Sequence, residues 1–149
     1  MNFGSSFGIS ASALTAQRLR MDVISSNVAN AETTRASVVD GKAVPYRRKL
    51  VVMEATESNK FSNILNSKMN GSNNEGVKVQ SIIEDTSPLK PVYNPSHPDA
   101  DAEGYVYMPN VDITKEMVDM LSASRSYEAN VTMLNASKAM VSKALEIGR

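Results

Sequence analysis

The stretch "DITKEMVDMLSASRSYEANVTMLNASKAMVSKALEIG", from Asp112 to Gly148, decides the fold. Its residues follow a seam in which spacings of four and three positions alternate over more than four heptads. The seam consists of Ile113, Met117, Met120, Ser124, Tyr127, Val131, Leu134, Lys138, Val141 and Leu145, of which only Ser124 and Lys138 are polar. Asp112 is a suitable N-cap, and no proline follows Pro109. The pattern therefore predicts one long helix.

A second helical pattern lies near the start of the chain. Two adjacent apolar stripes have helical spacing, one through Ile9, Ala13, Ala16 and Val23 and the other through Leu14, Met21, Ile24 and Val28. The polar sequence "SSNVANAETTR", from Ser25 to Arg35, follows directly. The first helix should therefore end near Asn30.

Shorter alternating segments between these helices indicate strands. "YRRKLVVME", Tyr46 to Glu54, and "GVKVQSIIED", Gly76 to Asp85, alternate apolar and polar residues. Residues 56–75 are rich in Asn and Ser and predict a mobile loop. Residues 86–109 are rich in proline and predict an extended segment with one edge strand at Tyr105 to Met108.

These elements together predict an α+β protein. Its architecture would be a long antiparallel pair of N- and C-terminal helices, packed like a coiled coil, that carries a small β-rich insert and extended loops. Residues 1–32 and 110–149 would form a discontinuous helical domain, and residues 33–109 would form the insert.

The two helices present more apolar surface than one pair can bury. Most of a helix's stability in a protein comes from packing its apolar face, and a broad uncovered face marks an interaction surface. We therefore expect a subunit that polymerises through its terminal helices. The expected interface residues are Leu14, Met21, Ile24, Asn27, Val28, Asn30, Met117, Met120, Tyr127, Val131, Leu134, Lys138, Val141 and Leu145.

Lys138 is the most informative member of the seam. A lysine at such a position costs stability and fixes the register of packed helices, with its aliphatic stem buried and its ammonium group extended toward an acid. Asn27, Asn30, Thr33 and Thr34 are the polar residues expected to hydrogen-bond at the turn after the first helix or to a neighbouring subunit.

The composition argues against several classes of protein. Sixteen basic residues balance sixteen acidic ones, so the charge expected of a nucleic-acid binder is missing. The absence of cysteine excludes disulfides and thiolate chemistry. No stretch has the pattern of a cleavable signal peptide or the ~18 apolar residues of a membrane span.

The segment "HPDADAEG" carries four potential metal ligands, His97, Asp99, Asp101 and Glu103. It begins like a calcium-binding EF-hand loop, but Asn110 stands where the bidentate glutamate is needed, so a solvated acidic turn is the better interpretation. A hydrolase would have to use His97, the only histidine, with Asp99 or Asp101, and no nucleophile elbow accompanies it. We expect no enzyme activity, metal or cofactor.

The basic run "YRRK", Tyr46 to Lys49, has two readings. It is a possible contact for nucleic acid or lipid headgroups. Because the chain has no net charge, a solvent-facing strand or a salt bridge to an adjacent subunit is the favoured interpretation.

Three separated stretches resemble the bacterial flagellar rod, hook and axial protein family. They are "ALTAQRLRMDVISSNVANAETTR", "HPDADAEGYVYMPNVD" and "EMVDMLSASRSYEANVTMLNASKAMVSKALEIGR", and they occur in the family's order. The general family pattern has a Gly-Tyr type continuation after the Ala-Asn-x-x-Thr core, whereas "ANAETTRASVVDGKAVPYRRK" inserts residues before Pro45 and Tyr46, so we expect the local turn to differ from that of the family.

The resemblance implies a structural subunit of the proximal part of the flagellar rod, a tubular drive shaft that transmits torque toward the hook. Its partners would be copies of itself, other rod and basal-body proteins, and the flagellar type III export apparatus. Its location would be the periplasmic rod of the basal body, reached without a cleaved signal peptide. The alternative is a coiled-coil adaptor or secretion-linked regulator that binds a single partner.

Overall fold

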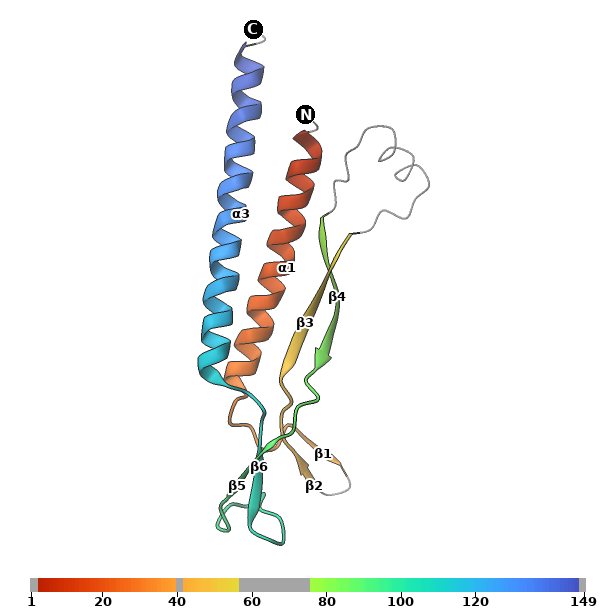
Figure 1. Cartoon of the computed structure of the whole chain (residues 1–149), viewed down its shortest axis with the longest axis vertical. Helices are drawn as coiled ribbons and strands as arrows, with labels where there is room; N and C mark the ends of the chain where they lie inside the picture. Colours follow the sequence, from red (N-terminus) through yellow and green to blue (C-terminus); the bar gives the residue numbers. More distant parts are fainter. Residues whose placement is uncertain (1–2, 40–41, 57–75, 148–149) are drawn as a thin grey trace, which may run out of the picture. The chain divides into compact units, whose positions relative to one another are not determined.

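The computed structural model describes residues 3–39, 42–56 and 76–147. In the described part of the chain, one long α-helix precedes the strands in the sequence and a second long α-helix follows them (Figure 1). The elements are α1 (Phe3–Ala29), β1 (Ser37–Val39), β2 (Lys42–Val44), β3 (Lys49–Ala55), β4 (Val77–Glu84), β5 (Lys90–Tyr93), β6 (Tyr105–Met108) and α3 (Ile113–Ile147). The α+β class predicted from the sequence is confirmed.

The ends of the helices follow the predicted capping. Asp112 Oδ1 accepts hydrogen bonds from the backbone N–H groups of Thr114 at 3.0 Å and Lys115 at 3.4 Å, which satisfies two donors of the first turn of α3. Helix α1 ends one residue before the predicted Asn30. Asn30 Nδ2 donates to the carbonyl oxygen of Ser26 at 2.9 Å and so satisfies an acceptor of the last turn.

The described strands form three two-stranded sheets, β1 with β2, β3 with β4, and β5 with β6. Alternation predicts β3 and β4, and β6 has the bounds predicted for the edge strand of the proline-rich segment. In the second sheet the Thr56 N–H donates to Gly76 O and the Asp85 N–H donates to Arg48 O, which makes β3 and β4 antiparallel.

Two pairings were missing from the sequence prediction. Strand β1 pairs with β2 so that Val39 lies opposite Lys42, which leaves two residues, Asp40 and Gly41, between them. An Asp-Gly dipeptide between apolar runs is a strong hairpin signal, so this hairpin was detectable. The expected extended segment also contains β5, where Pro91 is tolerated because, among the described strands, β5 pairs with β6 alone.

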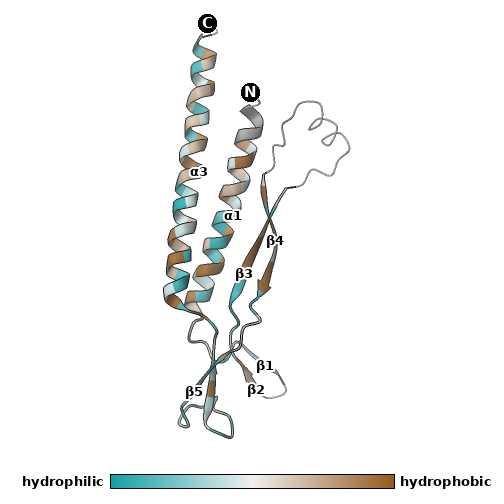
Figure 2. Cartoon of the chain, in the orientation of Figure 1, coloured by the Kyte–Doolittle hydropathy of each residue, from teal (hydrophilic) through white to brown (hydrophobic). Residues whose placement is uncertain are grey.

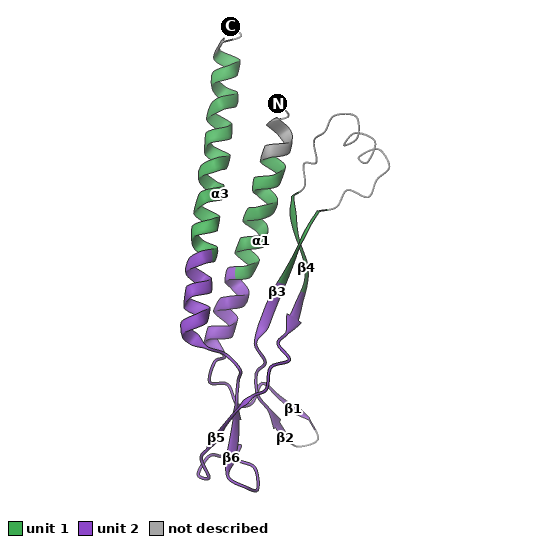
Figure 3. Ribbon diagram, in the orientation of Figure 1, with its two compact units in different colours: residues 1–20, 52–81, 123–149 green, residues 21–51, 82–122 purple. Residues whose placement is uncertain are grey.

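The chain divides into two compact units, and each contains parts of both helices and of the strands (Figure 3). Unit 1 comprises residues 1–20, 52–81 and 123–149, and unit 2 comprises residues 21–51 and 82–122. The division into a helical domain and an insert stays a prediction. Of the predicted mobile loop, residues 57–75 lie outside the described residues.

Burial along α3 follows a line of small and polar side chains. Glu116, Ala123 and Ser137 are the buried residues of this helix among those described, and they lie at multiples of seven positions. This line is one position before the predicted seam members Met117, Ser124 and Lys138. Figure 2 shows that hydrophobic residues recur along the ribbon of α3, and several of them, including Met117, Leu121 and Met133, are exposed. Consequently α3 buries Glu116, Ala123 and Ser137 and leaves many of its large apolar side chains exposed to solvent.

Candidate functional site: a buried polar cluster and an exposed helix face

Asn27, near the end of α1, is the centre of a buried polar cluster in unit 2. Its side chain is 1% exposed. Nδ2 donates to the Lys49 carbonyl oxygen at 2.9 Å and to Glu116 Oε2 at 3.0 Å. Oδ1 accepts from the Tyr46 hydroxyl and from the Lys49 N–H, both at 2.9 Å. An asparagine side chain has two donor hydrogens and two acceptor lone pairs, so its hydrogen-bonding capacity is fully used.

The two bonds to Lys49 resemble those of a neighbouring strand. Lys49 is the first residue of β3, and both its N–H and its C=O pair with the Asn27 amide. These groups would otherwise be unpaired polar groups beside a buried side chain, which costs free energy. Asn27 therefore fixes the start of β3 against the end of α1.

Glu116 in the first turn of α3 carries the acidic half of the cluster. Arg48 approaches Oε1 of Glu116 with both Nε and Nη2, each at 2.6 Å. The side chains are 12% and 1% exposed, respectively, so the ion pair is shielded from solvent. A buried carboxylate is tolerated when charged and hydrogen-bonding partners surround it, and Arg48 and Asn27 supply them here.

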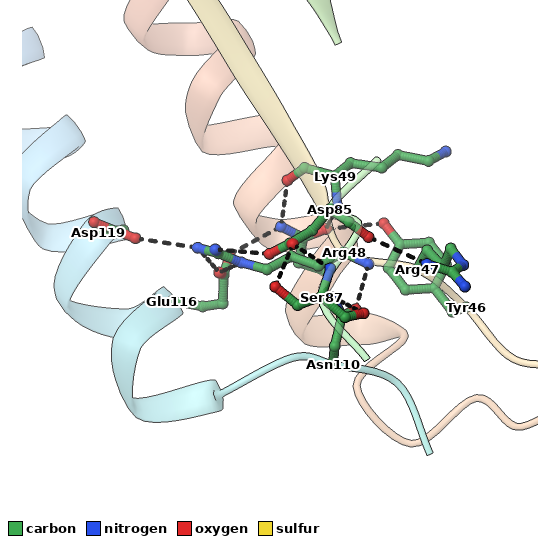
Figure 4. Close-up of polar contacts among 10 residues, drawn as sticks. Tyr46, Arg47, Arg48, Lys49, Asp85, Ser87, Asn110, Glu116 and Asp119 are labelled. Carbon is green, nitrogen blue, oxygen red and sulfur yellow. Dashed lines mark hydrogen bonds and ion pairs between the residues drawn. The ribbon is translucent and has the colours of Figure 1, made fainter. Parts of the chain in front are cut away.

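Arg48 also joins the strand segments to this centre (Figure 4). Its guanidinium lies 3.7 Å from Asp85 and 3.5 Å from Asp119, and its backbone N–H donates to Asn110 Oδ1 at 3.0 Å. The hydroxyl and backbone N–H of Ser87 donate to Asp85, which lowers the pKa of that carboxyl, and Arg48 lowers it further. The cluster thus holds four parts of unit 2 together: the end of α1, the start of β3, the residue after β4 and the first turn of α3.

A second polar contact links the segment after α1 to the β5–β6 connection. The Thr34 hydroxyl donates to Asp99 Oδ2 at 2.9 Å, and Arg35 Nε donates to Asp99 Oδ1 at 3.0 Å. Arg35 Nη2 contacts the same oxygen. The Arg35 hydrogen bonds, followed by that of Thr34, hold the pKa of Asp99 below its ordinary value. The four polar residues expected at this turn, Asn27, Asn30, Thr33 and Thr34, all form side-chain hydrogen bonds within the chain.

The acidic segment that resembled a calcium loop is a hydrogen-bonded turn. Asp101 Oδ1 accepts from the N–H groups of Glu103 at 3.0 Å and Tyr105 at 2.9 Å, and His97 Nδ1 accepts from the Asp99 N–H at 3.1 Å. Within residues 3–39, 42–56 and 76–147, no three acidic or histidine side chains are grouped as metal ligands would be.

The predicted interface residues differ in exposure. Ile24 and Asn27 are buried, and the half-buried members are Leu14, Met21, Asn30, Met120, Tyr127, Val131, Leu134 and Val141. The exposed members are Val28, Met117, Lys138 and Leu145. Asn27 uses its whole hydrogen-bonding capacity inside unit 2. The role of all these residues in a subunit interface stays a prediction.

Helix α3 exposes large apolar side chains along most of its length. Those of Met117, Val118 and Leu121 are 64%, 64% and 59% exposed. Ile113, Met133, Met140 and Leu145 are exposed as well. At about 100° per residue these seven residues are spread over more than half of the helix circumference, and we call this exposed apolar set the α3 apolar face. Single exposed apolar residues are ordinary, but a series along one helix marks an interaction surface.

Sequence reasoning identified Asn27 but not its partners. Tyr46, Arg48 and Glu116 come from segments that are distant from Asn27 in the sequence, so no local pattern connects them. The alternation assigns "YRRK" to the start of a strand, but β3 begins only at its last residue, Lys49, so Tyr46 and Arg48 precede the strand and take part in the cluster. "YRRK" is interpreted from the sequence as a contact for nucleic acid or lipid, or as a solvent-facing strand or a salt bridge to another subunit. Arg48 fits neither interpretation, because its charge is paired with Glu116 of its own chain.

Two family models match the ends of the chain. Residues 7–36 match "Flagella basal body rod protein", and residues 102–147 match "Flagellar basal body rod FlgEFG protein C-terminal". "Flagellar basal-body rod protein FlgC" of Bacillus subtilis (strain 168) is 61% identical over 146 residues, which is 97% of each chain. This chain belongs to the FlgC family of flagellar rod proteins.

Other FlgC relatives are similarly complete matches. That of Borreliella burgdorferi is 45% identical over 153 residues, covering 99% of this chain and 98% of its own. That of Escherichia coli O157:H7 is 46% identical over 143 residues, 96% of each. The resemblance inferred from the three motifs is confirmed, and this FlgC-family chain is a structural subunit of the flagellar basal-body rod. No described helix is both long and apolar enough to pass through a bilayer.

Proposed function

We propose that the chain polymerises through its terminal helices into the proximal part of the rod and transmits torque toward the hook. The α3 apolar face is the observation that carries this proposal, because a subunit that stayed alone would leave this surface in water. Contacts that do not close into a ring generate tubes and filaments, so a few such faces repeated by symmetry are enough to build a shaft.

The buried cluster would be the rigid joint of this subunit. A contact between the last turn of α1 and the first turn of α3 supports a pairing of the two helices, which we infer to be antiparallel and coiled-coil-like. A shaft under torque needs subunits that do not bend at the junction of helix and strand. Asn27, Arg48 and Glu116 supply buried, directional bonds at this junction in unit 2.

The remaining parts of the proposal concern location, partners and chemistry. We infer that the subunit lies in the periplasmic rod, arrives through the flagellar type III export apparatus with an uncleaved N-terminus, and packs against other rod proteins as well as its own copies. We also infer that it has no catalytic role. The likeness to FlgC proteins over nearly the full length supports these inferences.

The test is complementation of a Bacillus subtilis strain that lacks its own FlgC. Expression of this chain should restore swimming and hooks, and the chain should be present in isolated basal bodies. Met117→Glu should fold but be excluded from basal bodies, because it places a charge on the α3 apolar face. Asn135→Glu, at an exposed polar position of the same helix, is the control. Stable complexes with one other protein and no incorporation would favour an adaptor instead.

A further inference from the structure

The β5–β6 hairpin presents one face of aromatic and proline rings. In its register Pro91 lies opposite Tyr107 and Tyr93 lies opposite Tyr105, so these four residues share a face of the sheet. Val106 occupies the other face and is 3% exposed. Tyr93, Tyr105 and Tyr107 are 65%, 39% and 48% exposed, and Pro91 is exposed as well. We call these four residues the tyrosine face.

The rings of the tyrosine face are held in place. Tyr93 and Tyr105 pack edge to face, with ring centroids 5.4 Å apart and an interplanar angle of 67°. Gly104, at φ 81°, passes so close that a Cβ there would lie 3.1 Å from Tyr93 Cε2 and 3.3 Å from Pro95 Cβ. Because the rings are already ordered, a partner that binds them meets little further cost in conformational entropy.

The chemistry of this face favours a protein partner. None of its four side chains is charged, and exposed tyrosines are enriched at protein interfaces, where their rings pack and their hydroxyl groups bond. A polyanion would need basic residues that this face does not contain. The whole chain has a formal net charge of zero, so two copies meet without general electrostatic repulsion.

The size of the face indicates how it is used. A buried aromatic side chain contributes roughly 150–250 Å². Three half-exposed tyrosines therefore offer a few hundred Å², below the ~800 Å² per partner of a standard stable interface. Such a contact is weak alone, but it adds to stability when other contacts already hold the partners together.

We propose that the tyrosine face is a lateral contact to a second copy of this chain within the assembled rod. The proposal rests on the polymerisation proposed above, which supplies the other contacts and the high local concentration of copies. The tyrosine face would add a contact made by strands β5 and β6 to the contacts made by the helices. This contact lies in unit 2.

The experiment replaces Tyr107 by the photoreactive amino acid p-benzoylphenylalanine in the complemented Bacillus subtilis strain, with the same replacement of Tyr93 in parallel. Irradiated basal bodies should yield an adduct of twice the chain's mass that contains this chain alone. Purified chain at micromolar concentration should yield none. The matched control is the same probe at Val92, which is 47% exposed on the opposite face of the same hairpin.

The outcomes separate the two proposals. Adducts with a different protein from both tyrosine positions, or no adducts from basal bodies that contain the chain, would overturn the contact between copies. Adducts of equal yield from Val92 would overturn its assignment to the tyrosine face. Absence of the unmodified chain from basal bodies would overturn the polymerisation proposal and this one with it.

Discussion

Asn27 of α1 and Glu116 of α3 are joined by a 3.0 Å hydrogen bond between residues 89 positions apart. Each side chain is 1% exposed, and each has further partners around it. This bond connects the two terminal segments that the family models match separately. The described part of unit 2 is therefore organised around polar contacts as much as around its apolar core.

Asn27→Asp should destabilise the folded chain by about 2–4 kcal/mol. The substitution removes both Nδ2 donors and places a second carboxylate beside Glu116 in a buried site. Urea unfolding monitored by circular dichroism measures the change. Asn135→Asp is the matched control, because that residue is exposed on α3, and it should change stability by less than about 0.5 kcal/mol. Equal effects of the two variants would contradict the assigned role of Asn27.

Arg48→Met should cost about 3–5 kcal/mol, because it leaves the Glu116 carboxylate buried without its cation. The matched control is Arg125→Met, which breaks an ion pair whose side chains are 73% and 58% exposed and should cost at most about 1 kcal/mol. Combining Arg48→Met with Glu116→Gln should recover part of the loss, since no unpaired charge then remains at that position. A double variant less stable than Arg48→Met would argue against this explanation.

The sequence predicted the elements better than the site. Helical spacing and alternation depend on residues that are close in the sequence. Local patterns could therefore predict α1, α3, β3, β4 and β6. The cluster depends on which side of each element faces inward. The seam of α3 was assigned from apolar residues, but the buried line runs one position earlier through Glu116 and Ala123, because hydrogen bonds to Asn27 and Arg48 favour burial of an acid there.

Asp99 should make stability depend on acid pH. Its folded pKa lies below the ordinary 3.8, so the Arg35 and Thr34 contacts contribute stability that is fully present above that value. The contribution is lost as the pH falls through the folded pKa. Asp99→Asn should therefore lower stability at pH 7 and flatten the acid limb of a plot of unfolding free energy against pH. An unchanged acid limb would show that other carboxylates dominate it.

Lys138→Leu should leave the fold intact and change assembly. Lys138 is exposed, so its replacement removes no buried contact, and it adds an apolar side chain to the predicted seam. We expect an unchanged urea midpoint together with altered rods or reduced swimming in the complemented strain. Lys143→Leu, which affects only an exposed ion pair with Glu146, is the control. Normal motility and unchanged rods would count against a role of Lys138 in register.

Gly76→Ala should destabilise unit 1 through a contact with Ser12. A Cβ at position 76 would lie 2.8 Å from Ser12 Oγ, which donates to the Ile9 carbonyl oxygen at 2.7 Å and accepts from the Val77 N–H at 3.1 Å. Because both bonds fix the hydroxyl, either the backbone shifts or the bonds break, at a cost of about 1–3 kcal/mol.

A double-variant cycle isolates this contact. Ser12→Ala removes the oxygen, so Gly76→Ala should cost less in that background, with a coupling of about 0.5–2 kcal/mol. Gly8→Ala is the control, since a Cβ there meets nothing within 4 Å, and it should stabilise the helix by about 0.5–1 kcal/mol. Urea unfolding measures each change. If the effects of Ser12→Ala and Gly76→Ala are additive, the Ser12 hydroxyl is not what requires glycine at position 76.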